Sequence, residues 1–231
     1  MFPGLLKGML DALPSQCMVC HAWPTQPVCE ACVNRFAQPQ PRCSTCALPV
    51  PLGLRQCGAC VKTPPPLDAC LAAVSYTYPW SDLIVGYKFH QHPGHASAFA
   101  LLLRSAPWVE PALDAADAVL PMPLSRTRLQ TRGFNQALTL ARQLASEKTD
   151  SRLLLRIKDT PPQSSLQRSE RLASVRDAFA VEPLLLKRLK GARLVLVDDV
   201  MTSGASLFAA ARVLRAAGAA HITGLVIART E

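Results

Sequence analysis

The chain has 231 residues, of which 49% are hydrophobic, and it carries a formal net charge of +9. This length suits one medium domain together with a small one. No apolar run reaches the roughly 18 residues that a membrane-spanning helix needs, so the sequence argues against a membrane span.

The first sixteen residues have the spacing of an amphipathic helix. They carry one basic residue, Lys7, lack a long apolar stretch and lead directly into Cys17. We therefore expect a short helix that packs on the following module or on the main domain, not a targeting peptide, and a cytoplasmic protein. Its apolar positions are Phe2, Leu5, Leu6, Met9, Leu10 and Leu13.

Eight of the nine cysteines form four Cys-x-x-Cys pairs in about the first quarter of the chain. Each pair can present two thiolates to one metal ion, so two pairs complete a tetrahedral, all-cysteine zinc site. We therefore expect two zinc ions. Grouping successive pairs needs the shortest loops, although the spacing also permits interleaved pairs. The predicted ligands are Cys17, Cys20, Cys29, Cys32, Cys43, Cys46, Cys57 and Cys60.

Disulfide bonds are the main alternative for these cysteines. The chain shows no secretory signal and the cytosol keeps thiols reduced, so metal binding is favoured. Redox chemistry of the thioredoxin type would use one such pair beside a βαβ unit, which four pairs in a row do not match. The segment of about 60 residues has few large apolar side chains, so we expect the zinc to be structural rather than catalytic.

A proline-rich linker separates the cysteine-rich segment from the rest of the chain. We predict an N-terminal helix and double zinc ribbon over residues 1–62, a linker over 63–67 and the main domain over 68–231. Cys70 stands outside the pairs and is interpreted as a small buried apolar residue at the start of a strand.

Strands and helices alternate after the linker. Apolar patterns predict strands over residues 72–78, 118–124, 193–198 and 221–228, and helices over 81–89, 97–104, 134–146 and 207–217. This alternation is typical of an α/β fold with a parallel sheet covered by helices on both faces. Ligands of such folds bind at the carboxyl ends of the strands.

An arginine-rich loop is expected between the strand over 118–124 and the helix over 134–146. Arg126, Arg128 and Arg132 carry forked donors that suit a pyrophosphate, and Gly133 frees the backbone. A basic surface loop without a ligand is the alternative. Phe134, directly after the loop, is interpreted as a core anchor.

Most of the excess positive charge lies in residues 121–190, with fourteen Lys and Arg against six Asp and Glu. A bound pyrophosphate would account for part of it and single-stranded nucleic acid for more, whereas a solvated basic surface needs no ligand. Within this region, residues 156–171 are polar, basic and interrupted by prolines. Such a segment suits a lid that closes over substrate, or a plain surface excursion.

The most informative segment runs from Leu194 to Ser206. Four apolar residues lead into two carboxylates that can accept hydrogen bonds from a vicinal diol. A short loop of small residues then opens a helix, whose N-terminal N–H groups and dipole favour a phosphate. A diol acceptor beside a phosphate site is what a ribose 5-phosphate requires. The predicted contacts are Asp198, Asp199, Thr202, Ser203, Gly204, Ala205 and Ser206.

These motifs resemble known families. The segment over 194–206 resembles the loop that binds phosphoribosyl pyrophosphate (PRPP) in type I phosphoribosyltransferases. The four cysteine pairs, Lys88-Phe89, Pro121-Met-Pro-Leu124, Arg132-Gly-Phe-Asn-Gln136 and this loop also occur in the order found in the ComF/GntX family. Ser125 and Ser174 stand where that family would have a histidine and an asparagine.

The resemblance implies a double zinc ribbon fused to a type I phosphoribosyltransferase domain that binds PRPP with Mg²⁺. It also implies a role in natural competence, in the handling of incoming single-stranded DNA, or in growth on DNA as a nutrient.

Three functions fit these observations. The first is a phosphoribosyltransferase, for which the sequence names no acceptor. The second is a DNA-handling module that keeps PRPP or nucleotide binding as a sensor. The third is an adaptor whose ribbons dock a DNA-translocating ATPase. Acceptor-dependent release of pyrophosphate would identify the first, and salt-dependent DNA binding without a partner would separate the second from the third.

Overall fold

The computed structural model describes residues 15–89, 94–158 and 177–231. The chain divides into two compact units, Met1–Gln38 and Pro39–Glu231. Nearly all of the predicted N-terminal helix, most of the predicted lid and Ser174 lie outside the described residues. Within the described ranges, no helix combines the length and hydropathy that crossing a bilayer would require.

The first unit contains a cysteine knuckle followed by a short helix. The N–H of Cys17 donates to the carbonyl of Ala22 (3.0 Å), and the N–H of His21 donates back to the carbonyl of Cys17 (2.9 Å). Helix α2 (Glu30–Phe36) then begins directly after Cys29, its N-cap residue. The knuckle and the helix start bring the two Cys-x-x-Cys pairs of this unit together.

The second unit opens with the same arrangement. The N–H of Cys43 donates to the carbonyl of Leu48 (2.7 Å), and the N–H of Ala47 donates to the carbonyl of Cys43 (2.8 Å). Helix α3 (Gly58–Lys62) begins after Cys57. The residue after each knuckle is left-handed, with φ of 60° at His21 and 56° at Ala47. The two cysteine modules are therefore structural repeats.

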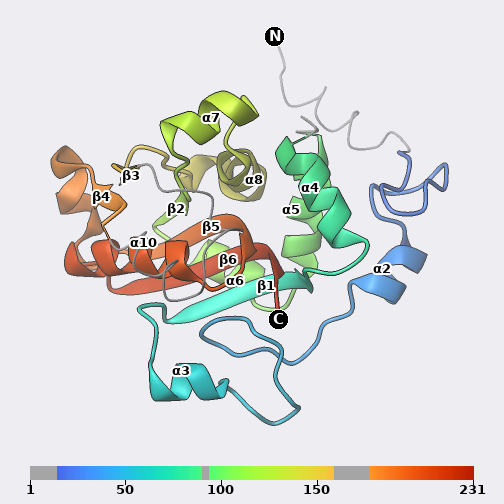
Figure 1. Ribbon diagram of the computed structural model, residues 1–231, viewed down its shortest axis with the longest axis horizontal. Helices are drawn as coiled ribbons and strands as arrows, with labels where there is room; N and C mark the ends of the chain where they lie inside the picture. The colour runs from blue at the N-terminus through green and yellow to red at the C-terminus, as the bar shows by residue number, and fades with distance from the viewer. Residues whose placement is uncertain (1–14, 90–93, 159–176) are drawn as a thin grey trace. The chain divides into compact units, whose positions relative to one another are not determined.

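Four parallel strands form the main sheet of the second unit (Figure 1). Their order is β1 (Ala69–Ser75), β6 (His221–Arg229), β5 (Arg193–Met201) and β2 (Ala118–Pro121). All three neighbouring pairs are parallel, which confirms the predicted sheet. Strands β5 and β6 are inner strands and almost wholly buried, as expected for a sheet covered on both faces.

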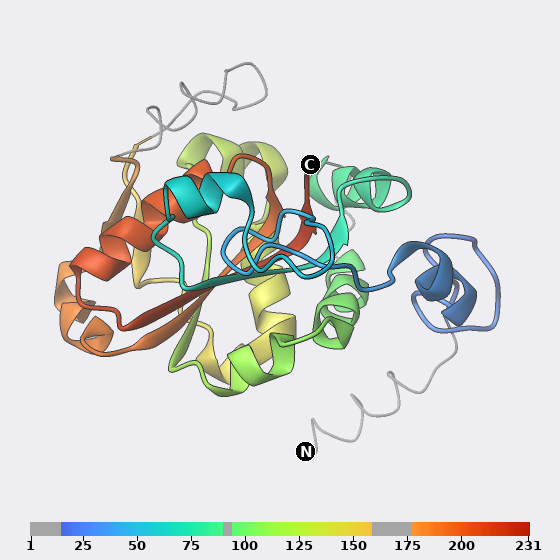
Figure 2. The ribbon, with the colours of Figure 1, turned by 90° about the horizontal axis from the view of Figure 1, so that it is seen from below.

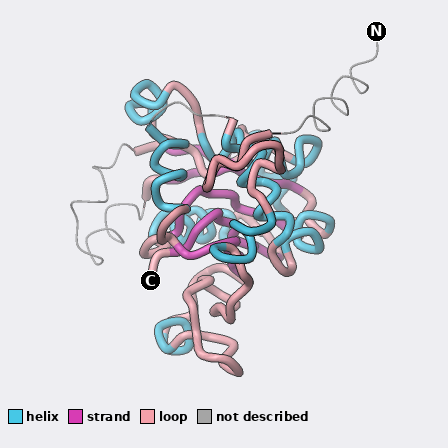
Figure 3. Tube along the Cα trace, turned by 90° about the vertical axis from the view of Figure 1, so that its right-hand side faces the viewer, coloured by secondary structure: helices cyan, strands magenta, loops and turns pink. Residues whose placement is uncertain are grey.

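Helices cover both faces of this sheet (Figures 2 and 3). Helix α10 (Ala205–Ala216) packs on β5 and β6, in one apolar cluster with Leu194, Leu196 and Ile222. Helices α5 (His95–Ser105) and α8 (Gln136–Ala145) pack on each other and on the sheet. Since side chains alternate along a strand, Val195 and Val197 of β5 face away from α10, toward this second layer.

The remaining elements are short. Helix α4 (Trp80–Phe89) follows β1, α6 (Val109–Asp114) precedes β2, and α7 (Arg126–Arg132) precedes α8. The 3₁₀ helix η1 (Ser146–Lys148) follows α8, and η3 (Pro183–Leu189) precedes β5. Strands β3 (Leu154–Arg156) and β4 (Phe179–Val181) form a separate antiparallel pair.

The predicted arginine-rich loop is wrong as a conformation, because residues 126–132 form helix α7. The Ser125 side chain caps this helix by accepting the N–H of Arg128 (3.3 Å), and Gly133 ends it at a φ of 78°. These two residues supply the start and stop that a short helix needs. Helix α7 buries none of its side chains. Its sequence therefore lacks the apolar periodicity by which a helix is predicted.

All four strands of the main sheet differ from their predicted bounds: β2 ends at Pro121 rather than at residue 124, and β6 ends one residue later than predicted, at Arg229. Strand β1 begins at Ala69, and β5 continues through both aspartates to Met201, because its pairing with β6 extends that far. Cys70 is 2% exposed and lies in β1, which confirms that it is a buried residue at a strand start.

Candidate functional site

A cavity of about 600 Å³ opens at the carboxyl end of β5. The turn into α10, the end of α4 and the segments around α7 line it. Eight of the ten predicted ribose-phosphate and pyrophosphate contacts line this cavity: Asp198, Asp199, Thr202, Gly204, Ala205, Ser206, Arg128 and Arg132. Ser203 and Arg126 are not among its lining residues, and Arg126 is exposed.

The acidic pair is held by its own backbone and by one lysine. Asp198 Oδ1 accepts the N–H of Asp199 (2.9 Å), and Asp199 Oδ1 accepts the N–H of Val200 (2.6 Å). Lys88 Nζ lies 2.8 Å from Asp199 Oδ1, and both side chains are mostly buried. The ammonium group of Lys88 therefore offsets part of the repulsion between the two carboxylates.

Asp198 is the more perturbed of the two acids. Burial, followed by the charge of Asp199, raises the pKa of Asp198 to about 7. Lys88 and Arg132 act in the opposite direction but do not cancel the rise. Asp198 thus changes charge near neutral pH, where an ionised carboxylate is needed to accept a diol or to face a cation.

The turn after Met201 leaves no room for a side chain at position 204. Gly204 has a φ of 79°, and a Cβ atom there would lie 2.5 Å from Met201 Cε and 2.6 Å from Phe208 Cζ. The carbonyl of Gly204 accepts the N–H of Phe208 (2.8 Å), which starts α10. The backbone N–H groups at this helix start therefore lie at the cavity wall, where an anion is favoured.

The basic side of the cavity is fixed by the residues around Arg132. Its guanidinium donates to Gln136 Oε1 (3.1 Å) and stacks over the ring of Phe89, 5.0 Å from the centroid. Burial is the largest cause that lowers the pKa of Arg132. A guanidinium with such a high intrinsic pKa stays charged, so this cation is partly desolvated and ready to pair with an anion.

The rest of the Arg-Gly-Phe-Asn-Gln motif holds the site together. Asn135 caps α8 by accepting the N–H of Leu138 (3.2 Å), and donates to the carbonyl of Met122 (3.1 Å). Gln136 donates to the carbonyl of Lys88 (3.3 Å), while Tyr87 donates to the carbonyl of Gln136 (2.8 Å). These bonds tie the end of α4 to the start of α8 and so position Lys88.

Sequence reasoning had not assigned Lys88 or Gln136 to the site. Lys88 occurs in a family motif, but only the fold shows that it pairs with Asp199. The cavity also has an apolar side, formed by Tyr76, Val85 and Phe89. Phe134 is half-buried and packs edge-on against Tyr87 at 5.7 Å, consistent with an anchor.

The eight paired cysteines form two groups of four, and within each group the sulfur atoms lie within 4.8 Å of one another. The groups are made by successive pairs, Cys17 to Cys32 and Cys43 to Cys60. His21 is exposed and belongs to neither group.

The geometry of these groups suits zinc. The sulfur atoms of Cys20 and Cys29 are 3.6 Å apart, and those of Cys46 and Cys57 are 3.7 Å apart. A tetrahedral zinc site with 2.3 Å bonds places its sulfurs about 3.8 Å apart, whereas a disulfide needs about 2.0 Å. Each group could therefore hold a structural zinc ion.

Comparisons with known proteins agree with this arrangement. The family model described as phosphoribosyl transferase domain matches residues 129–230. The chain is 30% identical over 227 residues to the "DNA utilization protein YhgH" of Salmonella typhimurium, covering 94% of this chain and 98% of the relative. The chain belongs to the ComF/GntX family.

Two further members of the ComF/GntX family carry competence names. The "Competence protein F" of Haemophilus influenzae is 30% identical over 211 residues, covering 87% of this chain and 90% of that protein. The "Competence protein ComFC" of Bacillus subtilis is 34% identical over 118 residues, covering 51% and 46% of the two chains. A phosphoribosyltransferase-like domain and a cysteine-rich N-terminal region thus define this ComF/GntX protein.

Two glycines with nearly equal φ angles allow a matched test of the phosphate loop. Gly191→Ala places a methyl group in open space at a φ of 75°, so it should cost only the backbone penalty of about 1–2 kcal/mol. Gly204→Ala adds the contacts with Met201 and Phe208. We expect it to lower Tm further and to weaken ribose 5-phosphate binding, measured by thermal denaturation and calorimetry. Equal effects of the two substitutions would contradict this account.

Asp198 should destabilise the fold as the pH rises. Between about pH 4 and 7 the folded state keeps the proton that the unfolded state has lost, so the free energy of unfolding falls across this window. Asp198→Asn cannot ionise. We expect this variant to match the parent Tm at pH 4 and to exceed it by about 5 °C at pH 8.

Asp68 provides a control, because its pKa is shifted in the opposite direction to that of Asp198. Burial would raise its pKa, but the N–H of Ile222 and the guanidinium of Arg215 outweigh burial and lower it. Asp68→Asn should therefore lower Tm at pH 8 and have less effect as the pH falls below the usual aspartate pKa. If both variants shift Tm in the same direction at pH 8, the assignment for Asp198 is wrong.

Proposed function

We propose that this protein binds PRPP in the cavity at the end of β5, as a phosphoribosyltransferase-like component of DNA utilization or competence. The observation that carries the proposal is the composition of that one cavity. Two carboxylates, a helix N-terminus that begins at a glycine, and three arginines (Arg128, Arg132 and Arg156) line the same 600 Å³. Diol, phosphate and pyrophosphate groups each find a complementary surface there.

Each group of PRPP has a proposed place. The ribose hydroxyls donate to Asp198 and Asp199. The 5-phosphate lies against the loop from Thr202 to Ser206, where backbone N–H groups and hydroxyls donate to it. The pyrophosphate lies toward α7, where Arg128 and Arg132 face the cavity and Arg126 lies on the adjoining surface. Mg²⁺ would accompany the pyrophosphate and neutralise part of its charge.

Lys88 has a proposed role in the same site. Without ligand its ammonium group pairs with Asp199, so the acidic pair is compensated before PRPP arrives. When ribose hydroxyls occupy the carboxylates, this ammonium group is available to the negatively charged pyrophosphate, which lies on the same side as Arg132. Lys88 therefore offsets the charge of the acidic pair in the ligand-free protein and contributes to PRPP binding.

A transfer reaction at this site would be a displacement at the anomeric carbon. The lone pair of an acceptor forms the new bond to that carbon, and the bond to the pyrophosphate oxygen breaks with its electron pair leaving on pyrophosphate. Arg132 and Arg128 would stabilise the departing charge. The apolar side formed by Tyr76, Val85 and Phe89 leaves space beside the ribose for an acceptor that is at least partly apolar.

Calorimetric titration of PRPP with Mg²⁺ tests the binding proposal. Lys88→Met removes the ammonium group but keeps a side chain of similar length, and should weaken binding at pH 7 at least about tenfold, or about 1.4 kcal/mol. Asp199→Asn should have a comparable effect. Lys187→Met, at an exposed position of η3, is the matched control and should bind as the parent does. Absence of binding to the parent protein would refute the proposal.

Single-stranded DNA handling is a second proposed function. It is favoured by the basic excess in residues 121–190 and by the names of the relatives, which refer to DNA utilization and competence. A docked DNA-translocating ATPase would be a partner in such a role. Fluorescence anisotropy with a labelled oligonucleotide should show affinity that falls steeply as salt is raised. Affinity independent of salt would exclude this basic surface as the binding site.

A further inference from the structure

The second cysteine cluster, Cys43, Cys46, Cys57 and Cys60, is part of the core of the α/β unit. Cys43, Cys46 and Cys60 are each at most 5% exposed and share one apolar cluster with Met201, Ala205 and Leu207. Met201 ends β5, and the other two open α10. The cluster and the phosphate loop are therefore packed into the same interior.

A backbone connection is made through Arg229, the last residue of β6. Its Nε donates to the carbonyl of Cys46 (2.9 Å), and another of its nitrogens donates to the carbonyl of Met201 (3.1 Å). Arg229 is 8% exposed, so both bonds are shielded from competing water. One guanidinium thus fixes the knuckle of the cluster relative to the residue at which the phosphate loop begins.

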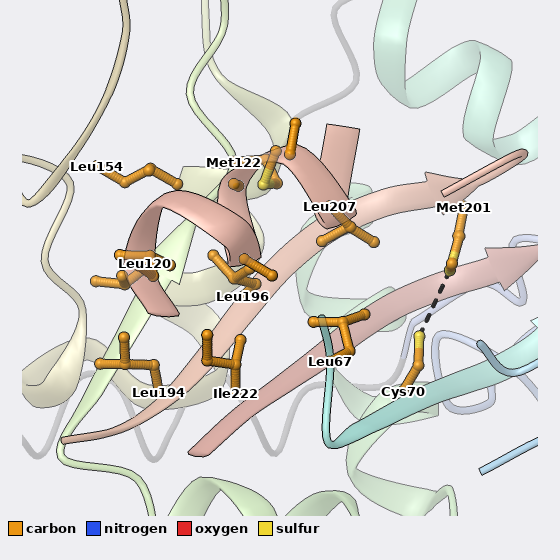
Figure 4. Close-up of a cluster of buried hydrophobic side chains, with 14 of the residues drawn as sticks. Leu67, Cys70, Leu120, Met122, Leu154, Leu194, Leu196, Met201, Leu207 and Ile222 are labelled. Carbon is orange, nitrogen blue, oxygen red and sulfur yellow. Dashed lines mark hydrogen bonds between the residues drawn. The ribbon is translucent and has the colours of Figure 1, made fainter. Parts of the chain in front are cut away.

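A side-chain connection runs through Cys70 and Met201, which point toward one another in Figure 4. The N–H of Cys70 donates to the carbonyl of Ser44, inside the knuckle (2.8 Å), and the Cys70 thiol donates to Met201 Sδ (3.5 Å). Met201 Cε in turn fills the space beside Gly204 and lines the cavity. Displacement of the knuckle would therefore change the packing around Gly204.

We propose that Arg229, Cys70 and Met201 are positioning residues that make the shape of the phosphate loop depend on the second cysteine cluster. The first cluster belongs to the other unit, Met1–Gln38, and the connections through these three residues all start from the second. The two repeated modules therefore have unequal roles: loss of metal from the second disturbs the loop, and loss from the first does not. The part of this inference that concerns ligand binding rests on the proposed function.

Thermodynamic reciprocity gives a second consequence. If metal in the second cluster favours the loop geometry that binds phosphate, phosphate binding must favour metal retention by the same factor. Ribose 5-phosphate should therefore raise the affinity of the second cluster for zinc, so that a chelator removes less of this zinc at equilibrium. The extent of zinc release from the first cluster should not change.

Matched cysteine variants test the proposal. Cys29 and Cys57 occupy the same place in their modules, at the N-cap of α2 and α3, and both are half-buried. Hydrogen–deuterium exchange of the loop over residues 202–206 would be measured in zinc-loaded full-length protein without ligand. We expect Cys57→Ser to speed this exchange about tenfold or more, and Cys29→Ser to leave it unchanged. Equal exchange in the two variants would overturn the proposal.

A second pair of variants keeps all eight ligands. Arg229→Gln removes the donors to Cys46 and Met201. Arg215→Gln removes the ion pair with Asp68 and the bonds to the carbonyls of Ala219 and Ala220, at the other end of the sheet. Both should lower Tm. Only Arg229→Gln should speed exchange at 202–206 and abolish the effect of ribose 5-phosphate on zinc release, with zinc content still two per chain. A similar result for both arginines would reduce Arg229 to a general stabilising residue.

The exchange measurement without ligand and the measurements with ligand test this inference and the proposed function separately. Ligand-free exchange does not depend on what the cavity binds. If the parent binds neither PRPP nor ribose 5-phosphate but Cys57→Ser still speeds loop exchange, the proposed function fails and the coupling stands. If ligand binds and the loop is indifferent to Cys57→Ser and Arg229→Gln, the coupling fails and the proposed function stands.

Discussion

Two neighbouring carboxylates at the end of a buried strand repel each other, and the site is organised around the groups that offset this repulsion. Asp198 and Asp199 are held close together, because β5 is paired with β6 at Asp198 and, beyond Asp199, at Val200 and Met201. Compensation therefore comes from other elements: Lys88 from α4 and Arg132 from α7. Gln136 accepts a hydrogen bond from the Arg132 guanidinium and donates one to the backbone carbonyl of Lys88, so a single buried amide contacts both elements that carry these cations.

Under the proposed function, this arrangement would serve a ligand that carries hydroxyls and phosphates. The acids accept hydrogen bonds, the α10 N-terminus offers donors, and the arginines supply positive charge, all around one space. The net charge of Asp198, Asp199, Lys88 and Arg132 is close to neutral when Asp198 is ionised. A highly charged ligand thus meets a surface whose charges are already paired, and binding exchanges protein partners for ligand partners rather than exposing bare charges.

The sequence allowed the parallel sheet, the acidic pair near a strand end and the cysteine groups to be predicted, because each is encoded locally. Buried strands such as β5 show as apolar runs, and Gly204 marks a turn that only glycine fits. Helix α7 could not be recognised, since its side chains are all exposed to some degree and only its caps signal it. Lys88 could not be assigned either, because its partner Asp199 is 111 positions away in the numbering and meets it only in the folded sheet.

The cysteine repeats show how similar motifs can acquire unequal surroundings. Both knuckles have the same pattern of hydrogen bonds and a left-handed residue at the same position, His21 or Ala47. The local Cys-x-x-Cys spacing accounts for the conformation of both knuckles. The spacing of the cysteines does not determine which elements each module packs against. The second module lies against β1 and the ends of β5 and β6, through Cys70, Met201 and Arg229, and its cysteines become part of a core built mostly from residues far along the chain.

The position of β6 in the sheet has a consequence for the order of folding. This strand comes last in the sequence of elements, yet it lies between β1 and β5. During synthesis β1 has no neighbour in the sheet until β6 has emerged, and it waits through some 150 residues of chain for that pairing. The cysteine modules, by contrast, close over short loops and can take up metal early. The interior that Arg229 completes therefore cannot be finished until β6 has emerged.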